Sequence, residues 1–208
     1  MLTLYDYLPS GNGYKLRLFL HKLAIPFRLI ELEIWEGETR TPEFLAKNSA
    51  GQIPLLEFED GTHLAQSGAM LWYFAEGTPF APKDRMERAL TLQWMFFEQY
   101  SHEPNVAVAR AWMHVVGGTL TDHQKAELPN RIARGYKALD AMEAHLATHR
   151  FFVGERFGLA DIALYAYTHV ADEGGFDLAK YPAIRAWITR VAAEPRHVPI
   201  TWRPGDKA

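Results

Sequence analysis

The chain has 208 residues, 48% of them hydrophobic and 13% aromatic, which is enough for one large domain or two small ones with ordinary cores. The formal net charge is only -3 and no basic face stands out, which argues against nucleic acid as the main partner. Because the sequence contains no cysteine, disulfides, thiolate metal sites and cysteine nucleophiles are excluded.

The first 76 residues alternate between strand and helix signals. Apolar runs bounded by turn residues predict strands, and apolar residues at helical spacing predict helices. In chain order we expect a strand at 2–5, a helix ending at 24, a strand at 27–32, a short helix from 41, strands at 53–58 and 62–64, and a helix at 66–74. One βαβ unit followed by a hairpin and a closing helix predicts a compact α/β domain over residues 1–76.

Residues 77–83 predict a short linker because they are rich in glycine and proline, and strand signals nearly vanish beyond them. Apolar residues recur at helical spacing in later stretches around 90–97, 132–146, 159–166 and 184–191. The prolines from Pro195 onward predict an irregular tail. We therefore expect an all-helical bundle domain over residues 84–208.

The N-terminal residues lack the basic region and apolar run of a secretory signal, and no stretch approaches the ~18 apolar residues that a bilayer span needs. We expect a cytoplasmic protein that does not insert into a membrane. His145 and His149 have the spacing of metal ligands on a helix, but the glutamate of the zinc protease motif is missing. A solvated helix face is the better interpretation of this pair, so we predict no metal site.

Three segments carry candidate chemistry, and each also has an ordinary structural explanation. The segments Ser10–Lys15 and Gln66–Ser67 lie at the start of predicted helices, where N-caps and anion sites use the same N–H groups and the same positive helix end. Pro54 follows Ile53 at the start of a strand, which indicates either an edge strand or a cis peptide. Taken singly, the structural explanation is favoured for each segment.

Together these segments resemble the glutathione transferase superfamily, and the resemblance covers nearly the whole chain. The run from Tyr5 to Arg17 is similar to the zeta and theta classes, in which a serine at the Ser10 position serves the glutathione sulfur. It also resembles the bacterial nu class, in which a threonine and an asparagine occupy the Ser10 and Asn12 positions. The segment Asn48–Pro54 adds to the match.

The resemblance implies a thioredoxin-like first domain in which Ser10 and Asn12 activate the thiolate of glutathione. It places further contacts to glutathione at Thr39, Arg40, Gln52, Ile53, Pro54, Gln66 and Ser67. In the family the counterpart of Pro54 is cis, and the residue before it pairs its backbone with the cysteinyl part of glutathione. The counterparts of Gln66 and Ser67 hold the γ-glutamyl end.

The second domain carries a family mark of its own. The run from Val153 to Ala163 resembles the buried capping box of the family, with Gly158 in place of the usual serine or threonine. Glycine is a tolerable N-cap, but the reciprocal hydroxyl bond is missing. In the aromatic-rich zone before it, Tyr100 and Trp112 are predicted to line a pocket for the electrophile.

We therefore predict a detoxifying glutathione transferase that uses glutathione as co-substrate to attack small electrophiles or peroxides. The resemblance also implies a homodimer. One alternative is a glutathione-dependent isomerase of the zeta type, against which Asn12 counts because that class has a cysteine there. The other is a non-catalytic transferase-like module, and such modules often lose the glutathione-site residues that this chain retains.

Overall fold

The computed structural model describes residues 1–117 and 119–207. The chain folds into two compact units, one formed by Met1–Pro79 with Pro195–Ala208 and the other by Phe80–Glu194. The sequence analysis assigned the tail to the helical domain, whereas the structure groups it with the first unit. The physical reason is that Arg17 and Tyr14, both buried, donate hydrogen bonds to backbone carbonyls of the tail.

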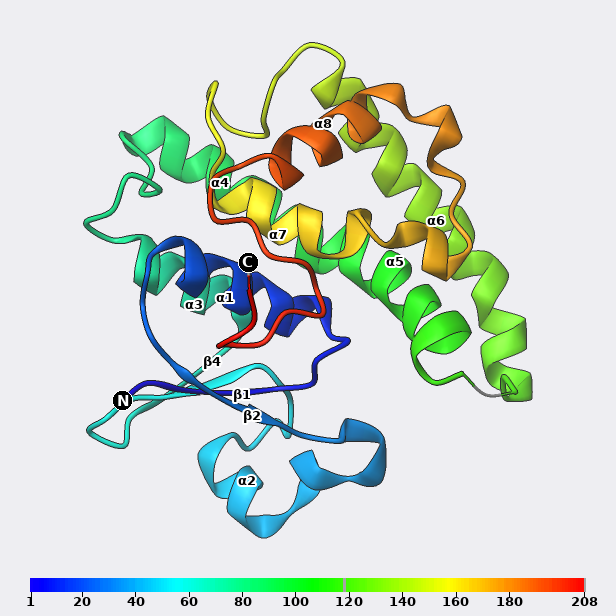
Figure 1. Cartoon of the computed structure of the whole chain (residues 1–208). Helices are drawn as coiled ribbons and strands as arrows, with labels where there is room; N and C mark the ends of the chain where they lie inside the picture. Colours follow the sequence, from blue (N-terminus) through cyan, green and yellow to red (C-terminus); the bar gives the residue numbers. More distant parts are fainter. Residues whose placement is uncertain (118, 208) are drawn as a thin grey trace. The chain divides into compact units, whose positions relative to one another are not determined.

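Figure 1 labels the helices and strands along the chain. The first unit contains β1 (Thr3–Asp6), α1 (Gly11–Lys22), β2 (Arg28–Glu31), α2 (Pro42–Lys47), β3 (Leu55–Glu57), β4 (His63–Ala65) and α3 (Ser67–Ala75). The second unit contains α4 (Arg85–Phe97), α5 (Glu103–Arg110), α6 (Asp122–Leu146), α7 (Leu159–Thr168) and α8 (Pro182–Ala192). Within the described residues, no helix combines the length and the apolar character that a membrane span requires.

The first unit is built on a four-stranded mixed sheet with the strand order β2-β1-β3-β4. Strand β1 pairs in parallel with β2 and antiparallel with β3, and β4 pairs antiparallel with β3. Helices α1 and α3 lie side by side on one face of the sheet, while α2 lies on the opposite side. This is the predicted thioredoxin-like α/β architecture.

Helix α1 forms because Ser10 caps its N-terminus and because nearly every residue from Gly13 to Leu20 finds a buried environment. Leu4 and Leu56 of the sheet are fully buried as well, and α1 packs against α3. At α2, the Thr41 hydroxyl accepts a hydrogen bond from the Phe44 N–H, and Pro42 occupies the first turn. Short apolar strands and well-capped helices therefore fix the first unit, as the sequence predicted.

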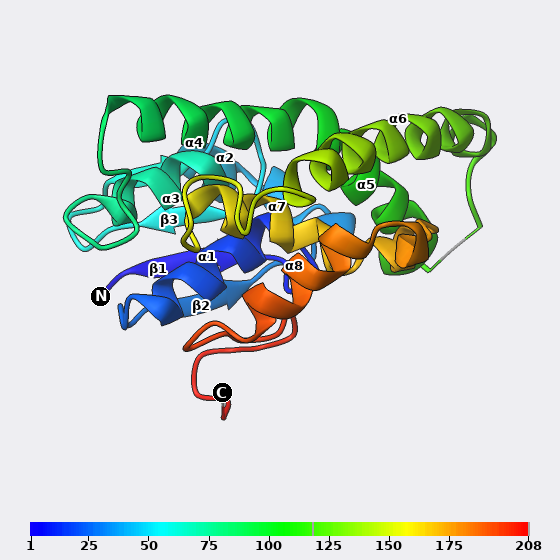
Figure 2. The same ribbon diagram turned by 90° about the horizontal axis from the view of Figure 1, so that it is seen from above.

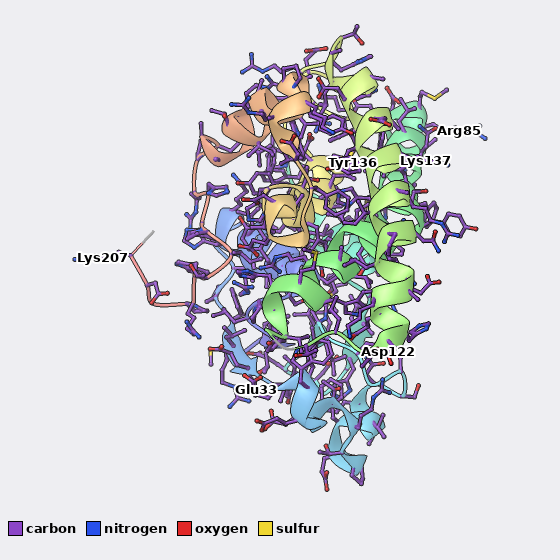
Figure 3. The ribbon with its side chains drawn as sticks, turned by 90° about the vertical axis from the view of Figure 1, so that its right-hand side faces the viewer. Glu33, Arg85, Asp122, Tyr136, Lys137 and Lys207 are labelled. Carbon is purple, nitrogen blue, oxygen red and sulfur yellow. The ribbon has the colours of Figure 1, made fainter. Side chains whose placement is uncertain are left out.

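The second unit is all-helical, as predicted, and is organised around α7, which is buried along its whole length. Figure 2 shows α7 between α4 and α8. The long α6 presents Tyr136 toward Phe176, with ring centroids 5.2 Å apart, while the next residue, Lys137, is exposed. Figure 3 labels both residues on this helix. Alternation of this kind along α6 is what buries one face of a helix and leaves the other in water.

The sequence analysis did not identify α5 or the two π-helical segments that flank it, Glu98–His102 and Ala111–Val115. The buried apolar residues of α5 are small, so their periodicity is weak. A π-helical turn inserts an extra residue into a helix and often occurs at functional sites. Each segment contains one residue predicted for the electrophile pocket: Tyr100 in the first and Trp112 in the second.

Candidate functional site

The start of α1 is the first element of the candidate site. Ser10 is the N-cap of this helix, and its Oγ accepts a hydrogen bond of 3.4 Å from the Gly13 N–H. A hydroxyl that accepts through its oxygen still carries a proton to donate. The N–H groups of the first turn and the helix dipole add positive potential at this point. The position therefore suits an anionic sulfur.

The start of α3 is the second element. Gln66 precedes the helix with φ 71° and ψ 111°, a conformation that is strained for any residue other than glycine. Ser67, the first helical residue, is buried, and Gln66 is exposed. The sequence analysis allowed for Ser67 as an N-cap. The structure instead places Gln66 at the cap without a capping side-chain hydrogen bond. The strain is consistent with a ligand-binding turn.

The two helix starts are joined by a contact cluster of Asn12, Lys15 and Ser67. Asn12 Oδ1 accepts a hydrogen bond of 2.7 Å from Lys15 Nζ and another of 3.3 Å from Ser67 Oγ. Lys15 Nζ also lies 3.5 Å from Ser67 Oγ. Lys15 is only 1% exposed, so a buried ammonium group sits beside two predicted glutathione contacts. The sequence analysis did not assign a role to Lys15.

A second group of predicted residues surrounds the turn before β3. Thr39 is buried, and the exposed Arg40 donates a hydrogen bond of 3.1 Å to the carbonyl of Ala50. Gly51 has φ +60°, and a Cβ there would lie 2.5 Å from Arg40 Nη1 and 2.9 Å from the Thr39 carbonyl oxygen. A glycine is therefore required at this close approach. The Arg40 side chain is therefore held against the backbone of the turn at Ala50, and its charge lies at the protein surface.

The segment that leads into β3 carries the remaining predicted contacts. The carbonyl of Gln52 accepts a hydrogen bond of 2.8 Å from Asn48 Nδ2, and its side chain is exposed. The peptide bond between Ile53 and Pro54 is cis, as the family resemblance implied.

Two tyrosines of the first unit, Tyr5 and Tyr14, donate hydrogen bonds from their hydroxyls to other groups. Tyr5 Oη donates a hydrogen bond of 2.7 Å to Glu57, and Tyr14 Oη donates one of 2.7 Å to the carbonyl of Val198. Hydrogen bonds to Glu57, first from a lysine and then from Tyr5, lower its pKa to about 2, so it remains a charged acceptor for Tyr5 at neutral pH. The hydroxyls of both tyrosines are therefore donors to acceptors of the first unit itself.

A buried ion pair supports the loop that carries Ser10. Arg17 Nε lies 2.8 Å from Asp6 Oδ2, and both side chains are fully buried. Arg17 Nη2 donates a hydrogen bond of 2.6 Å to the carbonyl of Leu8, two residues before Ser10. Burial raises the pKa of Asp6 to about 6, and the neighbouring Arg17 limits that rise. The loop is thus attached to the interior of the first unit through Arg17.

The predicted pocket residues Tyr100 and Trp112 belong to the second unit. Tyr100 is 87% exposed in the segment Glu98–His102. Trp112 is partly buried in the segment Ala111–Val115, and Arg131 Cζ lies 5.9 Å from its ring centroid. An exposed aromatic ring and an indole stacked on a guanidinium offer apolar and cationic contacts to a ligand. Within residues 1–117 and 119–207, no group of three or more potential metal ligands gathers.

Comparisons with known proteins match both parts of the chain. Residues 1–76 match a model described as the glutathione S-transferase N-terminal domain, and residues 89–195 match the corresponding C-terminal domain. A glutathione S-transferase structure from Pseudomonas fluorescens [Pf-5] is 50% identical, with a TM-score of 0.92 over 96% of this chain and 98% of that one.

A second solved structure, described as a possible glutathione S-transferase from Rhodopseudomonas palustris, is also 50% identical. Its TM-score is 0.94 over 98% of this chain and 99% of that one. Among the curated proteins, the disulfide-bond oxidoreductase YfcG of Escherichia coli (strain K12) is 29% identical over 94% of this chain and 92% of its own length.

Proposed function

This chain belongs to the glutathione S-transferase family, and we propose that it binds glutathione at the starts of α1 and α3 and activates its sulfur for attack on a small electrophile or a peroxide. The observation that supports this proposal is the convergence of Ser10, Asn12 and Ser67 with two helix N-termini. The thiolate forms a bond to the electrophilic atom, and the leaving group departs with the electron pair of the broken bond.

The energies of ordinary hydrogen bonds are sufficient for this activation. A free thiol with a pKa of ~8.5 is only a few per cent ionised near neutral pH. Lowering that pKa by ~2 units requires ~2.7 kcal/mol of preferential stabilisation of the thiolate. A hydrogen bond to a charged acceptor contributes ~1.5–3 kcal/mol, so the Ser10 hydroxyl together with the Asn12 amide or the helix end suffices.

Disulfide reduction is a second candidate because the relative YfcG is named a disulfide-bond oxidoreductase. In that reaction the glutathione thiolate attacks one sulfur of a disulfide, and the other sulfur leaves as a thiolate. The product is a mixed disulfide between glutathione and the substrate. Since this chain has no cysteine, the attacking thiolate and the disulfide must both come from ligands. The same activated sulfur therefore serves either reaction.

The family resemblance supports further parts of the proposal. We propose that residues 1–76 bind glutathione, that residues 84–208 supply the electrophile pocket with Tyr100 and Trp112, and that the protein acts as a cytoplasmic homodimer in detoxification. Binding without catalysis and isomerisation of the zeta type remain the alternatives. A turnover screen with halogenated aromatics, hydroperoxides and small disulfides, with glutathione present, distinguishes the transfer reactions from binding without catalysis.

The direct test is a pH titration of the ultraviolet absorbance of the bound thiolate. We expect glutathione bound to the unmodified protein to ionise well below ~8.5, the value of a free thiol. Ser10→Ala should raise the pKa of the bound thiol by about one to two units, the equivalent of one lost charged hydrogen bond. If calorimetry shows no binding of glutathione, or the bound thiol titrates like the free one, the proposed activation is wrong.

A further inference from the structure

Lys15 is a charged residue in an interior position. It lies in the second turn of α1 between Tyr14 and Leu16, and all three residues are almost completely buried. Removing an ammonium group from water is unfavourable unless hydrogen-bond acceptors surround it. Two of its acceptors, Asn12 Oδ1 and Ser67 Oγ, are neutral groups of the candidate glutathione site. These two contacts link Lys15 to both helix starts of the candidate site.

The contact with Lys15 fixes the orientation of the Asn12 amide. A lysine ammonium group has three donors and no acceptor, so the amide atom that faces it at 2.7 Å must be the carbonyl oxygen. The Ser67 hydroxyl, 3.3 Å from the same oxygen, agrees with this orientation. The amide nitrogen Nδ2 consequently points away from Lys15. In the reverse orientation, two donors would face each other.

We infer that Lys15 is a positioning residue for the glutathione sulfur: by donating to Oδ1 of Asn12, it orients the amide so that Nδ2 is presented to the sulfur. This inference rests on the proposed function. The inference extends that function to Lys15, which contacts both Asn12 and Ser67. The role joins the sulfur end of the site, at α1, to the γ-glutamyl end, at α3.

The effect of Lys15 on the sulfur should depend on pH. An oriented amide donor favours the thiolate over the thiol. Lys15→Met removes the contact that orients the Asn12 amide. We expect the pKa of the bound thiol to rise by about one unit, so that turnover falls about tenfold well below that pKa. At a pH above the new pKa the deficit should disappear, because the sulfur is then ionised in both proteins.

The test compares Lys15→Met with the matched control Lys137→Met, which removes an exposed lysine from α6 (Figure 3). The two readouts are the absorbance titration of bound glutathione and the pH profile of kcat. Lys15→Arg should restore much of the wild-type titration because it keeps a buried donor with a positive charge. A general packing defect would lower turnover equally at every pH, and that result would overturn the inference.

A double-mutant cycle tests whether Lys15 acts through Asn12. If it does, Lys15→Met combined with Asn12→Ala should shift the thiol pKa little further than Asn12→Ala alone. Full addition of the two shifts would overturn the positioning role. Should Lys15→Met fail to fold, Lys15→Leu replaces it, since this variant also removes the donor to Asn12 Oδ1 and adds no charge. An unshifted thiol in Lys15→Leu would likewise overturn the inference.

These outcomes separate the inference from the proposed function. If the unmodified protein binds glutathione and lowers the pKa of its thiol, the proposed function holds whatever Lys15→Met shows. A normal titration in Lys15→Met then removes Lys15 alone. If the unmodified protein does not bind glutathione, the proposed function fails first, and the inference about Lys15 fails with it.

Discussion

Each unit of the molecule buries an aspartate completely, and the two carboxylates are stabilised by different partners. In the first unit, Asp6 pairs with the guanidinium of Arg17 at 2.8 Å. In the second, Asp161 accepts hydrogen bonds from neutral donors, which are the N–H groups of Phe152 (3.2 Å) and Gly158 (3.0 Å) and the indole of Trp187 (2.8 Å). Burial raises the pKa of Asp6 to about 6 and that of Asp161 to about 7.

The difference follows from what each aspartate holds together. The Arg17 side chain that neutralises Asp6 also binds the carbonyls of Leu8, Ile200 and Trp202, so this pair joins the Ser10 loop to the tail. Asp161 connects only its own helix start to the preceding loop and to α8. In the unit with the candidate site, the buried aspartate is paired with the cation Arg17. In the helical unit, nearby N–H donors are enough to stabilise the buried Asp161.

The largest effect is expected from breaking the ion pair. Arg17→Met leaves Asp6 buried without its cation and removes donors from several carbonyls, so we expect a loss of about 3–5 kcal/mol in the free energy of unfolding. Denaturation by urea measures this loss. The control is Arg28→Met, which replaces an exposed arginine of β2 and should change the free energy by less than about 0.5 kcal/mol. Equal effects in the two variants would show that the buried pair does not brace the fold.

A smaller, pH-dependent effect is expected from Asp161→Asn. The new amide can still accept from Phe152 and Trp187 through its oxygen, but its NH₂ group faces the N–H of Gly158. One unsatisfied buried donor costs about 1–3 kcal/mol. Urea denaturation of both proteins across pH 4–8 therefore measures the cost and its dependence on protonation.

The sign of the pH dependence follows from the raised pKa of Asp161, which burial moves from 3.8 to about 7. Between these values the unfolded chain ionises while the folded protein keeps the proton, so folded stability falls as the pH rises. Asp161→Asn removes this contribution. Its destabilisation relative to the unmodified protein should thus be largest near pH 4 and smallest above pH 7. A destabilisation that is constant across this range would contradict the raised pKa.

The sequence predicted most elements of the fold because their signals are local. Ser10 and Thr41 cap the helices that they were expected to begin, and the apolar runs became the strands of the sheet. The family resemblance also supplied the cis peptide before Pro54. Helix α5 was not predicted because its apolar periodicity is weak. The position of the tail was not predicted because the tail is held by contacts with residues more than 170 positions away.

The roles of Lys15 and Arg17 were not predicted for a related reason. A lysine and an arginine two residues apart on an amphipathic helix normally face the solvent. In α1 the sheet covers one side, while α3 and the tail cover others, so both charges are buried. His145 shows the same limitation, because its ring packs 4.8 Å from Trp94 instead of lying on the expected solvated face. Burial from several directions depends on segments that are distant in the sequence.

The smallest effect is expected at the neutral contact between α1 and the tail. Tyr14 Oη donates a hydrogen bond of 2.7 Å to the carbonyl of Val198, and this carbonyl needs no charge to be satisfied. Tyr14→Phe keeps the ring and removes the hydroxyl, which also lies 3.3 Å from His197 Nε2, so we expect a loss of about 0.5–1.5 kcal/mol in the free energy of unfolding. The control is Tyr73→Phe, at a ring that is 54% exposed, where a change below about 0.5 kcal/mol is expected.

Limited proteolysis of the tail distinguishes the two attachments of this segment. If the tail is held mainly through Arg17, Tyr14→Phe should increase the rate of cleavage in residues 195–208 only slightly, and Arg17→Met should increase it strongly. Removing Arg17 should cost more than removing one neutral hydroxyl. The carbonyls of Leu8, Ile200 and Trp202 all lose their charged donor at once. Equal cleavage rates in the two variants would mean that Tyr14 holds the tail as firmly as the ion pair does.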